Sequence, residues 1–168
     1  MIVSLIAAVS ENKVIGKDNK LVWDLPRDMK FFMDTTLGHY IITGRKNYES
    51  IPEKFRPLKN RTNIIVTRQK KFLAKGAIVV HSLEEAFHLA AEAHQQEVFV
   101  IGGGEIYRQS MNRADRLYIT EVKAKFSGDT YFPDYYKAEW KEISRIQNLP
   151  DEKHAYPYNF VLLEKIVA

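Results

Sequence analysis

Asp28 stands among large apolar side chains in the stretch LVWDLPRDMKFFM, which runs from residue 21 to residue 33. Pro26 suits the first turn of a helix, and Asp24, two residues earlier, is placed to cap that helix or to meet its positive end. One stripe of the predicted helix comprises Leu25, Asp28, Met29 and Phe32. Asp28 is either a first-turn acid turned toward solvent or a carboxylate in an apolar pocket. In the pocket it must bind a polar or cationic group, because a lone buried charge is too costly.

Two predicted strands end in glycine and open directly into helices. Gly44 ends one of them and is followed by Arg45 and Lys46, and the three glycines of VFVIGGGEIYRQ end the other. Glycine lets a ligand come close to the backbone, and a helix start offers free N–H groups to a phosphate. Two such junctions in one sheet predict a diphosphate ligand. The second is not the dinucleotide fingerprint, because Tyr107 occupies the third glycine position.

Arg68 follows a third strand, in IIVTRQKK, at the edge where open α/β sheets bind ligands. Beside the two junctions that could bind phosphate, it indicates an extra phosphate, as in NADP rather than NAD.

The sequence gives little support for other kinds of chemistry. The five histidines, at positions 39, 81, 88, 94 and 154, lack metal spacing, and the sequence contains neither a P-loop nor a serine-hydrolase elbow. A carboxylate, a phosphate-binding sheet and no nucleophile together indicate cofactor chemistry.

The elements that must position these residues alternate between strands and helices. Strands are predicted at 3–9, 39–44, 62–67, 77–81, 97–103, 115–122, 140–147 and 158–166, and helices after 24, after 44, at 82–94 and at 104–111. Alternation favours a largely parallel sheet covered on both faces, while the last two strands, with no helix between them, should pair antiparallel. Segment 10–24 shows no regular element, and a loop of that length is often functional. Ser82 and Glu85 form a predicted capping box.

Composition places the chain among ordinary globular proteins, as a single domain over residues 1–168. Cysteine is absent, which excludes disulfides and thiol chemistry and fits a reducing, cytoplasmic location. The formal charge of +4 is scattered, which favours an anionic small molecule over nucleic acid as the partner. No apolar run approaches membrane-spanning length, the first ten residues resemble a strand rather than a secretion signal, and a monomer is expected.

Several blocks together resemble the dihydrofolate reductase family over essentially the whole chain. They are SLIAAVSENKVIGKDNKLVWDLPRDMKFF, ITGRKNYESI, RTNIIVTR, VFVIGGGEIY, LYITEV and GDTYFPD, in the family's order and spacing, followed by the strand YNFVLLEK. The resemblance implies an α/β fold with a central eight-stranded, mostly parallel mixed sheet, an antiparallel C-terminal strand and about four flanking helices. The implied activity is hydride transfer from NADPH to dihydrofolate, which gives tetrahydrofolate. The resemblance also implies that the enzyme is an antifolate target, with antifolate inhibitors among its ligands.

The resemblance also implies a substrate site. Asp28 would anchor the pterin and promote its protonation, Thr120 would hydrogen-bond that carboxylate, and Trp23 would hold an ordered water nearby. The resemblance also places Leu21 among the catalytic residues, with Asp28, Trp23 and Thr120. Arg61 would pair with the glutamate α-carboxylate of folate, and the Ile101 carbonyl would face the pterin. Apolar walls are implied at Ile6, Ala8, Phe32, Ile51 and Leu58.

For the cofactor, the resemblance implies a cis peptide between Gly102 and Gly103, and Tyr107 near the nicotinamide. Segment 10–24 would be a mobile loop that closes over the nicotinamide. The full implied cofactor set is Ala8, Ile15, Gly16, Gly44, Arg45, Lys46, Asn47, Thr67, Arg68, Ile101, Gly102, Gly103, Gly104, Glu105, Ile106 and Tyr107. The preference for NADPH would come from its basic members and Thr67.

Two other functions are compatible with part of the sequence. A reductase of the same fold could act on another pterin or on a pyrimidine, but such a substrate without a glutamate tail would not need Arg61. A non-catalytic nucleotide- or RNA-binding module would explain the positive charge, but it leaves Asp28 and the long loop unexplained. The chain also departs from the usual family pattern, with Val22 in place of proline and a longer loop at 52–61.

Overall fold

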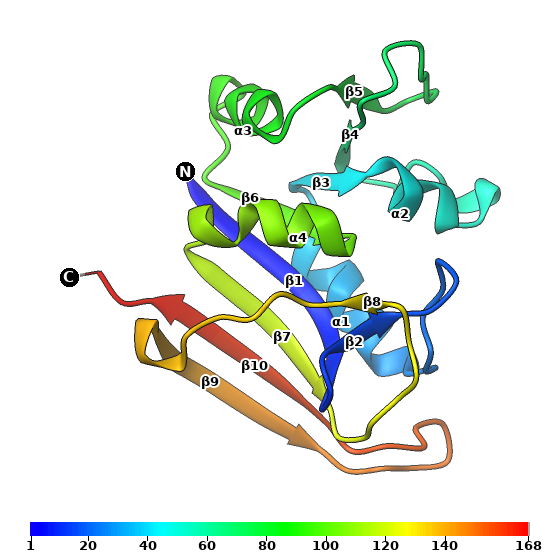
Figure 1. Ribbon diagram of the computed structural model, residues 1–168, viewed down its shortest axis with the longest axis vertical. Coiled ribbons are helices and arrows are strands. Elements are labelled where there is room, and N and C mark those ends of the chain that lie inside the picture. The colour runs from blue at the N-terminus through cyan, green and yellow to red at the C-terminus, as the bar shows by residue number, and fades with distance from the viewer. Residues whose placement is uncertain (168) are drawn as a thin grey trace.

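The computed structural model describes residues 1–167 and contains an eight-stranded sheet between helices (Figure 1). The strands are β1 (Ile2–Ser10), β3 (Tyr40–Gly44), β4 (Thr62–Val66), β5 (Ile78–Val80), β6 (Glu97–Gly102), β7 (Arg116–Val122), β9 (Trp140–Asn148) and β10 (Tyr158–Lys165). Their order in the sheet is β5-β4-β3-β6-β1-β7-β10-β9. β10 runs antiparallel to both of its neighbours, and all other neighbouring pairs are parallel. The predicted fold class is therefore confirmed, including the antiparallel C-terminal strand.

The segment 10–24 differs from the prediction, because part of it is a strand. β2 (Val14–Gly16) pairs antiparallel with β8 (Thr130–Tyr131) in a separate two-stranded sheet. Beyond β2 the chain turns back on itself, with an isolated bridge between Lys17 and Lys20. The partner strand lies more than 100 residues away, so no local pattern in segment 10–24 could indicate this pairing.

Four α-helices occupy the predicted places. They are α1 (Pro26–Thr36), α2 (Arg45–Ser50), α3 (Leu83–Glu92) and α4 (Gly104–Ser110), with short 3-10 helices η1 (Glu53–Phe55), η2 (Met111–Arg113) and η3 (Lys137–Glu139). Ser82 caps α3 by accepting a 3.1 Å bond from the N–H of Glu85. The cap predicted for α1 is wrong: Leu25 holds the cap position and makes no side-chain bond, and Asp24 is exposed. Within residues 1–167, every helix is too short or too polar to cross a membrane.

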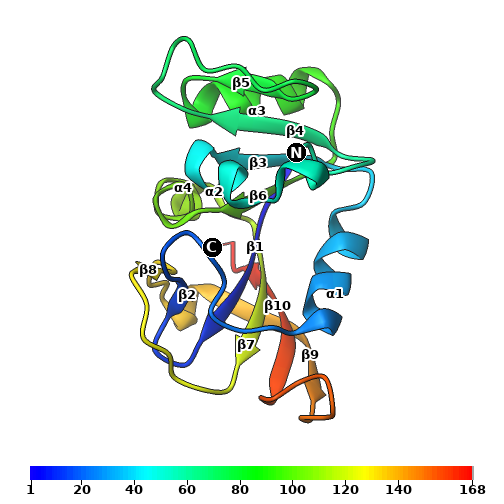
Figure 2. The same cartoon turned by 90° about the vertical axis from the view of Figure 1, so that its right-hand side faces the viewer.

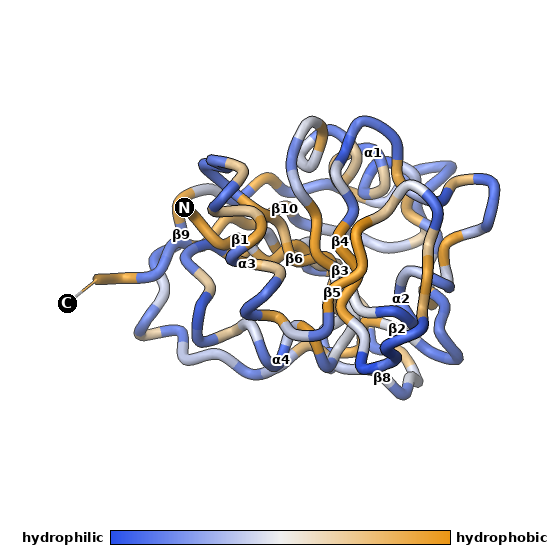
Figure 3. Tube along the Cα trace, turned by 90° about the horizontal axis from the view of Figure 1, so that it is seen from above, coloured by the Kyte–Doolittle hydropathy of each residue, from blue (hydrophilic) through white to orange (hydrophobic). Residues whose placement is uncertain are grey.

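The alternation of side chains along the strands divides the core between the two faces of the sheet. Leu5 packs with α3 and α4 on one face, whereas its neighbour Ile6 packs toward Phe31 and Phe32 of α1 on the other. Figure 2 shows α1 and α4 on opposite sides of β1. The central strands are the most hydrophobic part of the trace in Figure 3. The sheet, packed on both faces, thus forms a rigid layer that positions the loops at the ends of its strands.

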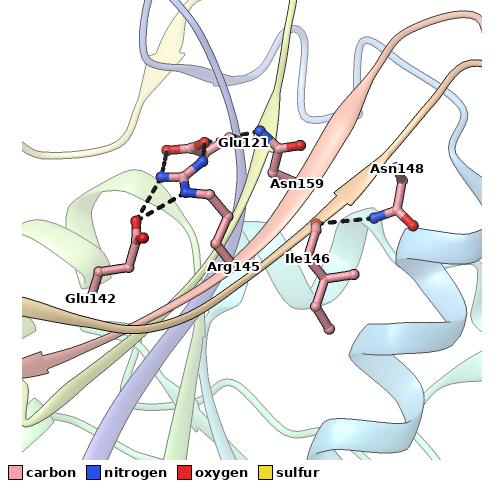
Figure 4. A network of polar contacts seen from close by, with 6 residues as sticks. All are labelled: Glu121, Glu142, Arg145, Ile146, Asn148 and Asn159. Carbon is pink, nitrogen blue, oxygen red and sulfur yellow. Dashed lines mark hydrogen bonds and ion pairs between the residues drawn. The ribbon is translucent and has the colours of Figure 1, made fainter.

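A polar network ties the C-terminal strands together (Figure 4). Arg145 of β9 donates bonds of 2.6 Å to Glu121 of β7 and 2.7 Å to Glu142, and Asn159 of β10 donates to Glu121. These hydrogen bonds raise the pKa of the Arg145 guanidinium. The network lines a small cavity of about 230 Å³, which shares no residue with the larger cavity below. Its charged groups satisfy one another and hold the edge strand β9.

Candidate active site

One large cavity, here called the main cavity, has a volume of about 1940 Å³. The ends of parallel strands β3, β4, β5 and β6 open into it, followed by the starts of helices α2 and α4. Helix α1 and the strands β1 and β7 form another wall, and β2 and β8 supply part of the rim. Ligands of open α/β sheets bind at this edge. The volume exceeds the roughly 300–1,000 Å³ of a pocket for one drug-sized ligand, so two ligands can lie side by side.

The main cavity brings together all of the predicted site residues except Trp23 and Arg61. Those that line it are Ile6, Ala8, Ile15, Gly16, Leu21, Asp28, Phe32, Gly44, Arg45, Lys46, Asn47, Ile51, Leu58, Thr67, Arg68, Ile101, Gly102, Gly103, Gly104, Glu105, Ile106, Tyr107 and Thr120. They come from eight separate elements and from the loops between them, so only the fold assembles them. This cavity is the candidate active site.

Asp28 lies in the first turn of α1 and lines the main cavity, as do the apolar side chains of Ile6 and Phe32. The Thr120 hydroxyl donates a 2.6 Å hydrogen bond to Asp28 Oδ1. Burial raises the pKa of the Asp28 carboxyl, and the bond from Thr120 opposes that rise. Of the two interpretations of Asp28, the structure supports the carboxylate in an apolar pocket. Its other oxygen still has acceptor capacity for a ligand.

The glycine turn after β6 also lines the main cavity. The peptide bond between Gly102 and Gly103 is cis, as the resemblance implies, and Gly102 has a φ of 122°. A Cβ on Gly102 would lie 3.3 Å from the Tyr107 ring, a contact that only glycine avoids. At Gly103 the nearest atom to such a Cβ is 3.9 Å away, on Asn47, so a ligand can approach this backbone closely.

Tyr107 and Asn47 hold this turn in place. The Tyr107 hydroxyl donates a 2.6 Å bond to the carbonyl of Ile6 in β1. Burial, and secondarily the charge of Asp28, raise the pKa of this phenol, so it stays a donor. The Asn47 amide donates to Thr43 Oγ1 at 2.9 Å and, more weakly, to the Ile101 carbonyl at 3.4 Å. Both sides of the turn are therefore fixed before any ligand binds.

Basic side chains that follow β3 and β4 also line the main cavity. Arg45, Lys46 and Arg68 line it beside Thr67. Arg45 is engaged in an ion pair with Glu49 on the same helix. Glu105 is the acidic member of this region, and hydrogen bonds from Gln109 and the charge of Arg108 lower the pKa of its carboxyl. Positive charge prevails here, as binding of phosphate groups requires.

Trp23 and Arg61 are the two predicted site residues that do not line the main cavity. The Trp23 side chain is buried against Phe126, with ring centroids 5.2 Å apart, and its Nε1 has no hydrogen-bond partner within residues 1–167. The Arg61 guanidinium donates to Thr36 Oγ1 at 2.8 Å and to the carbonyls of Lys59 and Met33. Burial lowers the pKa of Arg61, although the charge of Asp34 opposes this. These bonds use three of its five N–H groups and leave two for a ligand.

The loop from residue 10 to residue 24 forms the rim beside the glycine turn. Asp18 N–H donates a 3.0 Å bond to Asp129, and Asp129 N–H donates a 3.1 Å bond to the Gly16 carbonyl. The side chain of Leu21 lines the main cavity and is 54% exposed. Hydrogen bonds to Asp129 thus hold the loop at and just after β2, and beyond them the loop exposes the side chain of Leu21.

Several cavity residues were missed by the sequence reasoning. His81, Ser82 and Leu83 follow β5 and line the cavity. The strand-end rule that selected Arg68 would have found them if it had been applied to β5 as well. Asp129 and Thr130 reach the cavity only through the pairing of β8 with β2, and no signal in the sequence indicated that.

Comparisons with known proteins agree with this geometry. A family model described as dihydrofolate reductase matches residues 2–165. The chain is 42% identical to dihydrofolate reductase type 3 of Salmonella typhimurium over 98% of this chain and 99% of the relative. It is 43% identical to the Bacillus subtilis dihydrofolate reductase over 97% and 94% of the two chains. A solved structure of the Enterococcus faecalis enzyme, complexed with NADP(H) and RAB-propyl, superposes with a TM-score of 0.91 at 32% identity, over 99% of this chain and 97% of that one.

Proposed function

Because the chain belongs to the dihydrofolate reductase family, we propose that Asp28 anchors the pterin ring of 7,8-dihydrofolate in the main cavity and promotes its protonation. The protein is an NADPH-dependent oxidoreductase that reduces dihydrofolate to tetrahydrofolate. The observation that carries the proposal is the position of Asp28, which lines the apolar wall of the main cavity and is bonded to Thr120 at 2.6 Å.

The residues present fit NADPH as the cofactor. The open backbone at Gly103 offers a close approach for a flat ring, and the basic side of the main cavity suits phosphates. When bound, NADPH supplies the hydride for the reduction. We infer that Arg68, after β4, binds the phosphate that distinguishes NADPH from NADH. Tyr107 and Asn47 hold the glycine turn against which the nicotinamide end would lie.

Asp28 suits a pterin because of the donors that this ring presents. A pterin edge carries an amino group and a ring N–H side by side, and a carboxylate can accept both in a bidentate pair. Thr120 occupies only one acceptor position of Asp28 Oδ1, so both carboxylate oxygens keep capacity for the two donors of the ring. Burial raises the pKa of Asp28, which keeps a proton within reach of the substrate at higher pH than an exposed aspartate would.

Three further residues complete the proposed substrate site. The buried Nε1 of Trp23 lacks a protein acceptor among residues 1–167, which suits an ordered water that passes a proton toward the pterin. Arg61 is fixed by three bonds and has two N–H groups left for the glutamate carboxylate of the substrate. Leu21, exposed on the loop 10–24, is placed to exclude water when that loop closes over the nicotinamide.

The assay follows the absorbance of NADPH after addition of dihydrofolate, with NADH in a parallel cuvette. We expect fast loss with NADPH and slow loss with NADH. Asp24→Asn is a matched control for changes at Asp28, because Asp24 is exposed just before the same helix and does not line the cavity. No loss with either cofactor, in folded protein that binds NADPH, would point instead to another pterin or to a pyrimidine as the substrate.

A further inference from the structure

Helix α1, which carries Asp28, begins without a cap of its own. Leu25 at the cap position makes no side-chain bond, and Pro26 has no N–H to satisfy. The N–H groups of Asp28 and Met29 both donate to the Leu25 carbonyl, at 3.0 and 3.1 Å. Arg27 therefore holds the one N–H of the first turn that needs a partner from elsewhere in the chain.

That partner is His154, in the loop that joins β9 to β10. The Arg27 N–H donates a 3.1 Å bond to His154 Nε2 across 127 residues of sequence. In Figure 2 this loop lies beside the start of α1. We propose that His154 is a positioning residue, which caps helix α1 from this loop and thereby holds Asp28 in register with Thr120 and the substrate. The inference rests on the proposed role of Asp28.

The bonds of the ring define which nitrogen carries the proton. Nε2 accepts from Arg27, so the neutral ring carries its proton on Nδ1, which donates a 2.7 Å bond to Asp151 Oδ1. The backbones of Asp151 and His154 bond to each other in both directions, at 2.9 and 3.2 Å. The ring is only 5% exposed and stacks on Tyr158 with centroids 5.0 Å apart. The acceptor is thus built into a rigid turn.

Protonation of His154 would convert this acceptor into a donor, because both nitrogens of an imidazolium carry hydrogen. The charged residues on the elements packed against the ring are Asp151 on its own turn and Arg27 and Asp28 at the start of α1. Glu152 and Lys153 complete the turn and are exposed, and Tyr158 is the residue of β10 that stacks on the ring. The cap therefore requires a neutral ring, whereas an amide oxygen in its place would accept the same bond without titrating.

Two substitutions separate the cap from the packing of the ring. His154→Phe keeps an aromatic ring on Tyr158 but cannot accept a bond. His154→Gln places a side-chain oxygen about as far from the backbone as Nε2, so it restores an acceptor that does not titrate. We expect His154→Phe to raise KM for dihydrofolate by about three- to tenfold, because a lost cap weakens the start of the helix by a free energy of that order and so disturbs Asp28, while Kd for NADPH stays within about twofold. His154→Gln should behave as the wild type at neutral pH.

Amide hydrogen exchange of Arg27, read by NMR, tests the cap without any substrate. We expect protection in the wild type and in His154→Gln, and at least about tenfold faster exchange in His154→Phe. When the pH is lowered, protection should fall in the wild type more than in His154→Gln. A nitrogen chemical shift that places the proton of neutral His154 on Nε2 would overturn the proposal. So would wild-type protection and KM in His154→Phe, or equal losses of NADPH and dihydrofolate binding.

If His154→Phe does not fold, the comparison of wild type with His154→Gln still decides the matter, because identical pH profiles of Arg27 protection would refute the cap. If the wild type fails to reduce dihydrofolate, the proposed function falls. The exchange measurement would nevertheless report on the cap, since it needs only the folded protein. The two failures are therefore distinguishable.

Discussion

Thr120→Val is the sharpest single change to the candidate site, because it removes one hydroxyl and keeps the shape of a buried side chain. Thr120 is 3% exposed, and its hydroxyl donates a 2.6 Å hydrogen bond to Asp28 Oδ1. A hydrogen bond to a charged group contributes about 1.5–3 kcal/mol. If that energy orients Asp28 for the substrate, kcat/KM for dihydrofolate at neutral pH should fall by about 10- to 100-fold. Kd for NADPH should not change, since the basic side of the cavity is untouched.

The double-mutant cycle with Asp28→Asn tests whether Thr120 acts through Asp28. In the Asp28→Asn background the carboxylate is already gone, so Thr120→Val should cost less than about threefold. Thr120→Ser keeps the hydroxyl and should restore most of the activity. Steady-state rates of the four proteins, with Kd for NADPH from fluorescence, supply the cycle. A fall of similar size in both backgrounds would refute the reasoning, as would Thr120→Val with nearly wild-type kcat/KM.

Two further predictions concern the cofactor and stability. Arg68→Ala should reduce the preference for NADPH over NADH by about tenfold, which corresponds to the loss of one charge-assisted hydrogen bond. Lys70→Ala is the control, because Lys70 does not line the cavity, and it should leave the preference unchanged. If Arg68→Ala does not change the ratio of the two kcat/KM values, the phosphate site lies instead at Arg45 and Lys46. Asp28→Asn should raise the melting temperature at neutral pH. The pKa of Asp28 is raised in the folded state, so its charge costs stability as pH rises above the ordinary value of 3.8. Calorimetry should show the gain vanishing below that pH, and a gain that persists there would contradict this cause.

The sequence predicted the parts of the fold that local patterns encode. Runs rich in valine and isoleucine marked the eight strands of the main sheet, and the glycine junctions marked where α2 and α4 begin. The same local reasoning placed Asp28 at a helix start among apolar residues. The family's pattern then supplied the roles that spacing alone left open, and almost all of those residues line one cavity.

The parts that were missed depend on contacts between distant segments. The strand β2 exists because β8 lies beside it, and their sequences are too short to specify a strand independently. The cap of α1 was assigned to Asp24 because local residues usually provide caps, whereas the acceptor is His154. His154 had no metal spacing and so received no role. Only the three-dimensional structure shows that its ring meets the start of the helix that carries Asp28.

The central claim is that Asp28 both binds the pterin and promotes its protonation. The most direct test is the pH dependence of hydride transfer in single turnovers by Asp28→Asn, with Asp24→Asn as the control. We predict a loss of about 100-fold or more at neutral pH, the usual contribution of a positioned acid, with recovery as the pH falls and the substrate is protonated from solution. The control should follow the wild type at every pH. Wild-type rates of Asp28→Asn at neutral pH, or a loss that does not recover in acid, would contradict the assignment.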